Sequence, residues 1–142
     1  MKLRPDAIRA RLDHLSEVTL KLQRLRRLSP DERDPWSVER GLQLGTGIIL
    51  NIGAYVVAAH LKATTEGYEQ ILERLARHGV IPGELRQQLR GLGRFRNLLI
   101  HAYLDLDPDK IDQHLETAPE DFSRFSRAID SWLATVEPES EA

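Results

Sequence analysis

The chain of 142 residues contains no cysteine, which excludes disulfide bonds and metal sites built on thiolates. Its first residues lack the apolar run of a secretory signal peptide, so we expect a cytoplasmic protein. The sequence shows no alternation typical of strands, no internal repeat and no glycine-rich phosphate loop. His14, His60, His78 and His114 are not spaced as metal ligands. We therefore expect neither a metal nor another cofactor.

Apolar residues make up 41% of the chain and recur mainly at helical spacing. This length and content suffice for one compact domain with one core. The pattern predicts an all-α fold, an up-and-down bundle of four main helices plus short ones. We expect the domain to span residues 1–136 and the acidic residues 137–142 to form a frayed tail.

Start and stop signals divide the chain into helical segments. Asp34-Pro35 and Asp107-Pro108 are typical helix starts, and Thr117-Ala118-Pro119-Glu120 resembles a capping box. Gly79 is placed to end a short helix. The predicted helices cover residues 5–28, 35–62, about 64–78, 82–103, 108–115 and 119–136.

Residues 41–61 carry no Asp, Glu, Lys or Arg, and 21 uncharged residues are enough to span a membrane. Polar residues such as Asn51 and His60 interrupt the segment, and the other amphipathic helices need a partner. We therefore favour a central buried helix over a membrane span. Glycines at 41, 45, 47 and 53 would allow close approach of another backbone, from the helix of residues 82–103 or a second subunit.

Charge is distributed unevenly behind the net value of −2. Residues 1–103 carry 17 basic and 11 acidic side chains, whereas residues 104–142 carry 3 and 11. The mildly acidic pI alone does not indicate nucleic-acid binding. What matters is where the arginines lie.

An arginine interrupts the apolar stripe of the segment that follows Pro82. The stripe comprises, at steps of four or three, Leu85, Leu89, Leu92, Arg96, Leu99 and Tyr103. A guanidinium on a packed face is costly unless it is paired or faces a cleft. Arg96 is therefore either ion-paired to a carboxylate, for which Glu39 is a candidate, or part of a phosphate site.

A second stripe of the same segment is basic. It comprises Arg86, Arg90, Arg94, Asn97 and His101, again at steps of four or three. Each arginine alone would be read as a solvated surface residue, and His101 alone as a structural histidine. Together they indicate a path for a phosphate backbone.

The octet from Arg96 to Tyr103 resembles the R-x-x-x-x-H-x-Y signature of the HEPN superfamily, and in particular of HepT toxins. The match includes the polar Asn97 after the arginine. Residues 38–44 and the turn at residues 79–82 are also similar to HepT, and the likeness extends over residues 35–135.

This resemblance implies a metal-independent ribonuclease that works as a homodimer, with the Arg96 and His101 pairs of both subunits facing a shared cleft. It also implies a partner antitoxin, a minimal nucleotidyltransferase of the MntA type that can transfer AMP to Tyr103. The attached nucleotide would block the RNA cleft.

In the expected mechanism, the 2′-hydroxyl of the RNA attacks the adjacent phosphorus. His101 would remove or deliver a proton near neutral pH, and Arg96 would stabilise charge on the phosphoryl oxygens. Asn97 would orient the imidazole or bind a phosphate.

The spacing of the two catalytic candidates raises a geometric question. Five residues correspond to about 140° around an ideal helix, so Arg96 and His101 diverge unless the helix loosens or two chains contribute. Tyr103, seven residues on, returns to the side of Arg96. Two other hypotheses remain: a non-catalytic HEPN-like module that binds a nucleotide or partner, and a purely structural helical dimer.

Overall fold

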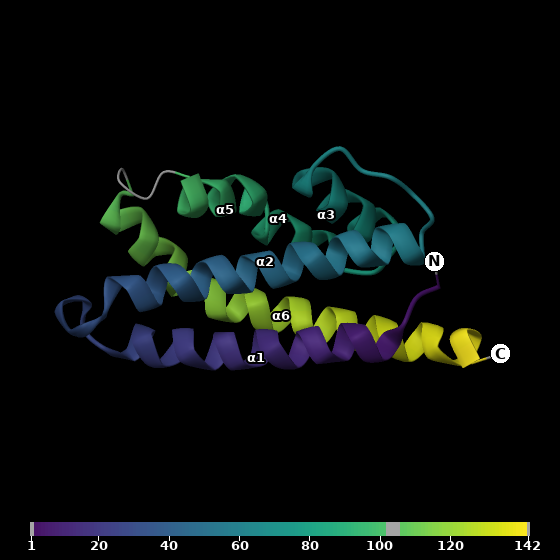
Figure 1. Cartoon of the computed structure of the whole chain (residues 1–142), viewed down its shortest axis with the longest axis horizontal. Helices are drawn as coiled ribbons and strands as arrows, with labels where there is room; N and C mark the ends of the chain where they lie inside the picture. The colour runs from purple at the N-terminus through teal and green to yellow at the C-terminus, as the bar shows by residue number, and fades with distance from the viewer. Residues whose placement is uncertain (1, 102–105, 142) are drawn as a thin grey trace.

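Three long helices lie side by side and form the core of the protein (Figure 1). The computed structural model describes residues 2–101 and 106–141, the last five by their backbone alone. The long helices are α1 (Pro5–Arg27), α2 (Pro35–Ala59) and α6 (Pro108–Glu141), and a 3₁₀ turn, η1 (Pro30–Glu32), joins the first two. The shorter α3 (Tyr68–Arg77), α4 (Gly83–Gln88) and α5 (Leu92–His101) lie on the side of α2 away from α1. No strand occurs in these ranges, which confirms the all-α prediction.

The central position of α2 follows from its composition. It contacts α1, α3, α5 and α6, and its buried side includes Leu42, Ile49 and Val56, all fully buried. Among the described residues, α2 is the one helix long and apolar enough to cross a membrane, but 56% of its apolar window is buried inside the protein. Packing against four neighbours accounts for the apolar surface, as expected for a core helix.

The start of α2 is where the sequence places it, but the cap differs in detail. Asp34 is the N-cap residue and Pro35 occupies the first turn. The Asp34 carboxylate makes no capping bond to the backbone and instead accepts a 2.7 Å hydrogen bond from the Ser37 hydroxyl. Proline at the first turn fixes the start, because its missing N–H would have no helical partner there.

The prediction of one long helix over residues 82–103 is wrong, because the chain turns between α4 and α5. Gly91 has a φ of +84°, a left-handed conformation that ends a helix and that glycine adopts without steric cost. Its N–H donates to Glu69 Oε1 at 2.7 Å, which fixes the turn against α3. The fourth main helix of the prediction is therefore two short helices.

The predicted break at Pro119 is also wrong, since α6 continues through it from Pro108 to Glu141. Proline inside a helix removes one backbone hydrogen bond and bends the axis. Figure 1 shows the first turns of α6 at an angle to the rest. Arg26 supports this segment: its Nη1 donates to the Glu116 carbonyl at 2.9 Å, and its Nη2 donates to Glu120 Oε1 at 2.9 Å.

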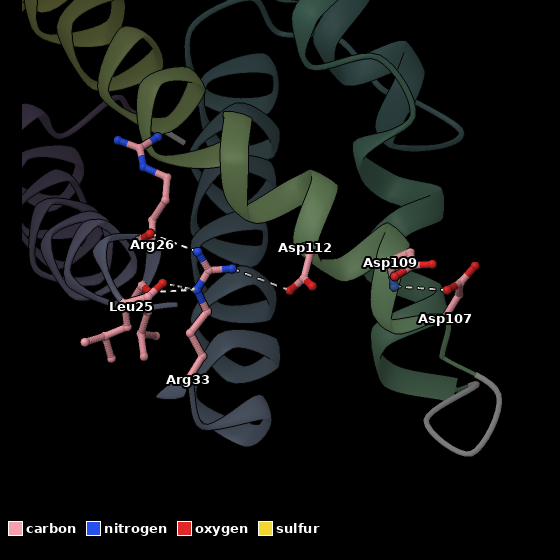
Figure 2. Close-up of polar contacts among 7 residues, drawn as sticks. Leu25, Arg26, Arg33, Asp107, Asp109 and Asp112 are labelled. Atoms are coloured by element: carbon pink, nitrogen blue, oxygen red, sulfur yellow. Dashed lines mark hydrogen bonds and ion pairs between the residues drawn. The ribbon is translucent and has the colours of Figure 1, made fainter. Parts of the chain in front are cut away.

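A second arginine holds the end of α1 (Figure 2). Arg33 Nε donates to the carbonyls of Leu25 and Leu28 at 2.9 and 3.0 Å, and its Nη2 donates to the Arg26 carbonyl at 2.9 Å. Asp112 of α6 lies 3.8 Å from Nη1. The last carbonyls of a helix have no helical partners, so this guanidinium supplies donors that the backbone lacks.

The start of α6 confirms the helix start predicted at Asp107-Pro108. Asp107 Oδ1 accepts a 3.0 Å hydrogen bond from the Asp109 N–H, as Figure 2 shows, and Pro108 occupies the first position of the helix. The backbone of α6 is helical through Glu141. The domain limit at residue 136 and the frayed tail stay predictions.

Candidate functional site

The candidate site depends on α5, which packs between α2 and α3. Phe95 and Leu99 are buried and anchor α5 on the core. Gly93 faces α3 so closely that an added Cβ would lie 2.6 Å from Tyr68 Cβ. The close approach brings the Tyr68 side chain to the surface of α5, where it meets Arg96.

Arg96 is half-buried and lies on an aromatic ring. Its Nη1 donates to Tyr68 Oη at 3.4 Å, and its guanidinium carbon is 5.9 Å from the centre of the Tyr68 ring. On the α2 side, a Cβ at Gly47 would lie 3.4 Å from Arg96 Nε. Gly47 therefore faces a side chain of α5, the predicted neighbour. The prediction is wrong for the other three glycines, where an added Cβ would meet Leu22 of α1, Phe122 of α6 and Ile71 of α3, at Gly41, Gly45 and Gly53 respectively.

Of the two alternatives for Arg96, the ion pair does not occur in the part of the chain that the structure describes. No carboxylate there pairs with Arg96, and Glu39 contributes instead to a pocket beside Arg33 and Leu106. A cation–aromatic contact stabilises the guanidinium without neutralising it. Arg96 therefore keeps its full charge and most of its donors for an anion.

His101 is the last residue of α5 that the structure describes and is exposed, as is Asn97. α5 is α-helical throughout, so the loosening considered as one way to bring Arg96 and His101 together does not occur between them. In regular helical geometry their side chains leave the axis about 140° apart. One chain alone therefore presents the two groups in different directions.

The arginines predicted to bind RNA do not form one continuous stripe. Arg86 lies on α4, Arg90 in the turn before α5 and Arg94 on α5, so the Gly91 turn interrupts their register. Arg90 and Arg94 are exposed, whereas Arg86 is half-buried with its Nε unpartnered. Their role in RNA binding stays a prediction.

Tyr103, the predicted acceptor of AMP, lies outside the described residues. In the ranges that are described, no group of three His, Asp or Glu side chains could hold a metal ion. Tyr68 was not identified from the sequence, because it lies 28 residues before Arg96 and the packing of α3 against α5 brings the two side chains together.

The described residues form an all-α bundle with Arg96 and His101 on one helix that borders the core, as the resemblance to the HEPN superfamily implies. A family model described as "Ribonuclease HepT-like" matches residues 8–129. The chain therefore belongs to the HepT-like family.

Individual relatives agree with this assignment. The chain is 26% identical to "tRNA nuclease HepT" of Aphanizomenon flos-aquae over 98% of both proteins. Its fold is similar to the cytosolic protein YutE of Bacillus subtilis, described as of unknown function, with a TM-score of 0.79 and 19% identity over 95% of this chain and 94% of that one. A toxin–antitoxin crystal structure with AMP-PNP contains a similar chain, with a TM-score of 0.78 and 19% identity over 89% of this chain and 98% of that one. At these identities the solved structures establish similarity of fold.

Proposed function

We propose that this chain is the toxin of a toxin–antitoxin pair and acts as a metal-independent endoribonuclease. Membership of the HepT-like family and the tRNA nuclease relative support RNA cleavage in general. The observation that assigns the reaction to particular residues is the environment of Arg96. It is half-buried on Tyr68 and has no carboxylate partner in the described chain, as a phosphate-binding arginine requires.

The reaction divides between two side chains. The RNA 2′-hydroxyl attacks the adjacent phosphorus while the bond from phosphorus to the 5′-oxygen breaks, leaving a 2′,3′-cyclic phosphate and a 5′-hydroxyl. The 2′-hydroxyl loses a proton and the leaving 5′-oxygen gains one; His101 carries out one of these transfers and water the other. Arg96 stabilises the negative charge that builds on the phosphoryl oxygens. Asn97, one turn before His101, orients the imidazole or holds a phosphate.

A homodimer would resolve the divergence of Arg96 and His101. In a two-fold symmetric pair, Arg96 of one subunit and His101 of the other can face the same phosphate, although they diverge within one helix. Arg90 and Arg94 are exposed and would extend the contact along the RNA backbone.

The partner proposed is a nucleotidyltransferase antitoxin that attaches AMP to Tyr103. The fold similarity to a chain from a toxin–antitoxin structure supports an antitoxin partner. Seven residues separate Tyr103 from Arg96, so on a continuing helix the added phosphate would lie near the arginine. We propose the cytoplasm as the location of the pair.

The test is RNA cleavage by the wild type, Arg96→Ala and His101→Ala, with circular dichroism to match folding. His78→Ala and Arg127→Ala are controls, because both residues are exposed and lie on other parts of the bundle. We expect loss of cleavage in the first two variants only, and cyclic phosphate ends on the products. Equal cleavage by all variants would contradict the roles of Arg96 and His101, and a wild type that does not cleave RNA would leave the non-catalytic HEPN-like module as the better account.

A further inference from the structure

A small cavity lies beneath the turn between α4 and α5. It has a volume of about 140 Å³ and is bounded by α2, α6 and the Gly91 turn. Its floor is apolar and buried, with Leu42, Leu89 and Phe122 on different elements. A cavity of this size admits about one six-membered aromatic ring and is too small for a drug-sized ligand.

One hydroxyl in this cavity has no partner. Thr46 of α2 is fully buried, and its Oγ1 forms no hydrogen bond within the described chain. The other buried threonine, Thr19, donates to the Leu15 carbonyl at 2.7 Å, as threonines inside helices commonly do. A buried hydroxyl without a partner carries a desolvation cost. Thr46 is among the residues that line the cavity, and its hydroxyl would gain from a partner there.

The mouth of the cavity is polar. Asp121 of α6 is half-buried there, and burial raises the pKa of its carboxyl above the ordinary value, although the nearby Arg124 opposes the shift. His114 stacks on Phe95 with 3.6 Å between ring centres and forms a flat wall. Arg90 is exposed beside the opening. The opening therefore combines the Asp121 carboxyl, which can accept a hydrogen bond from an N–H group, with the Arg90 guanidinium, which can bind a phosphate.

We propose that this cavity is a base-binding pocket that selects cytosine in single-stranded RNA. The proposal rests on the proposed function, because it assigns base preference to the same RNA. The volume suits one pyrimidine ring rather than a purine. The Asp121 carboxylate accepts from an exocyclic amine, which cytosine has and uracil lacks. Thr46 hydrogen-bonds the edge of the base, the apolar walls cover its faces, and Arg90 contacts the adjoining phosphate.

The test measures binding of short single-stranded oligo(C), oligo(U) and oligo(A) to the full chain carrying His101→Ala, so that RNA is not cut. We expect oligo(C) to bind about tenfold more tightly than the other two, equivalent to about 1.4 kcal/mol. Adding Thr46→Val or Asp121→Asn should reduce this preference to within about twofold, with oligo(U) affinity unchanged. Adding Thr19→Val, the matched control, should leave the preference intact.

Cytidine and uridine monophosphates provide a second measurement on the wild type. We expect the methyl NMR signal of Thr46 to shift with the cytidine nucleotide and not with the uridine nucleotide. RNA cleavage without a cytosine preference, or a preference that survives both pocket substitutions, would overturn the pocket and leave the nuclease proposal standing. Failure to bind or cleave any RNA would overturn both.

Discussion

Two arginines, Arg33 and Arg96, occupy opposite kinds of surroundings in this bundle. The Arg33 side chain is only 9% exposed, and it donates to three backbone carbonyls at the end of α1. Arg96 lies on Tyr68 with a single 3.4 Å hydrogen bond and no carboxylate partner in the described residues. The comparison separates an arginine whose donors complete the fold from one whose donors stay available for a ligand.

The largest expected effect is the loss of RNA cleavage when Arg96 is replaced. Arg96→Leu restores the apolar stripe and should remove the charge that stabilises the cleavage transition state. We expect RNA cleavage to fall by about 10²–10³-fold. Thermal unfolding should occur at the wild-type temperature or above it, because Arg96 forms no ion pair with the residues that the structure describes. Full cleavage by this variant would make Arg96 a structural residue like Arg33.

Arg33→Met should show the opposite result. The substitution removes donors from the carbonyls of Leu25, Arg26 and Leu28, so we expect the free energy of unfolding to fall by about 2 kcal/mol. Urea denaturation measures this change, with the exposed Arg27→Met as the control. Cleavage per folded molecule should match the wild type. A variant that is fully stable but inactive would reverse the roles assigned to the two arginines.

The buried threonines Thr19 and Thr46 also differ in whether their side chains form hydrogen bonds within the fold, and the expected effects on stability are smaller. Thr19→Val loses a 2.7 Å hydrogen bond and should destabilise the protein by about 0.5–1 kcal/mol. Thr46→Val loses none in the described chain and should leave the free energy of unfolding unchanged or raise it slightly. Paired urea denaturation curves compare the two. A larger loss for Thr46→Val would show that its hydroxyl is part of the folded framework.

The smallest effect concerns the Arg26–Glu120 pair, another structural arginine contact. The hydrogen bond from Arg26 lowers the pKa of Glu120 below its ordinary value of 4.5. The pair therefore stabilises the fold above that value, and the contribution is lost as pH falls through the lowered pKa. The residues are partly exposed, so we expect no more than about 1 kcal/mol. The stability difference between the wild type and Glu120→Gln, measured across this pH range, should shrink toward acid.

Two of the three long helices, α1 and α2, were predicted well because their signals are local. Apolar spacing and Pro35 were enough to place α1 and α2 within a few residues. The turn at Gly91 was missed and the break predicted at Pro119 was wrong because contacts distant in the sequence decide the course of the chain at both places. Glu69 fixes the Gly91 turn, and Arg26 supports the chain around Pro119.

The candidate site was predictable in part for the same reason. Helical spacing alone showed that Arg96 stands out among apolar residues. It could not show that Tyr68, rather than Glu39, lies beside the guanidinium, because that contact depends on how α3 folds back onto α5. The divergence of Arg96 and His101 also follows from spacing, and the regular helix of α5 removes the simplest way around it.

Mixing Arg96→Ala and His101→Ala subunits tests most directly whether two chains build one site. In a two-fold symmetric dimer, each mixed dimer has one site with both substitutions and one site with both native residues. After subunit exchange, about half of the dimers are mixed, so we predict about a quarter of wild-type RNA cleavage from two parents that are each inactive. Cleavage no greater than that of either parent, with mixed dimers shown to form, would contradict the account.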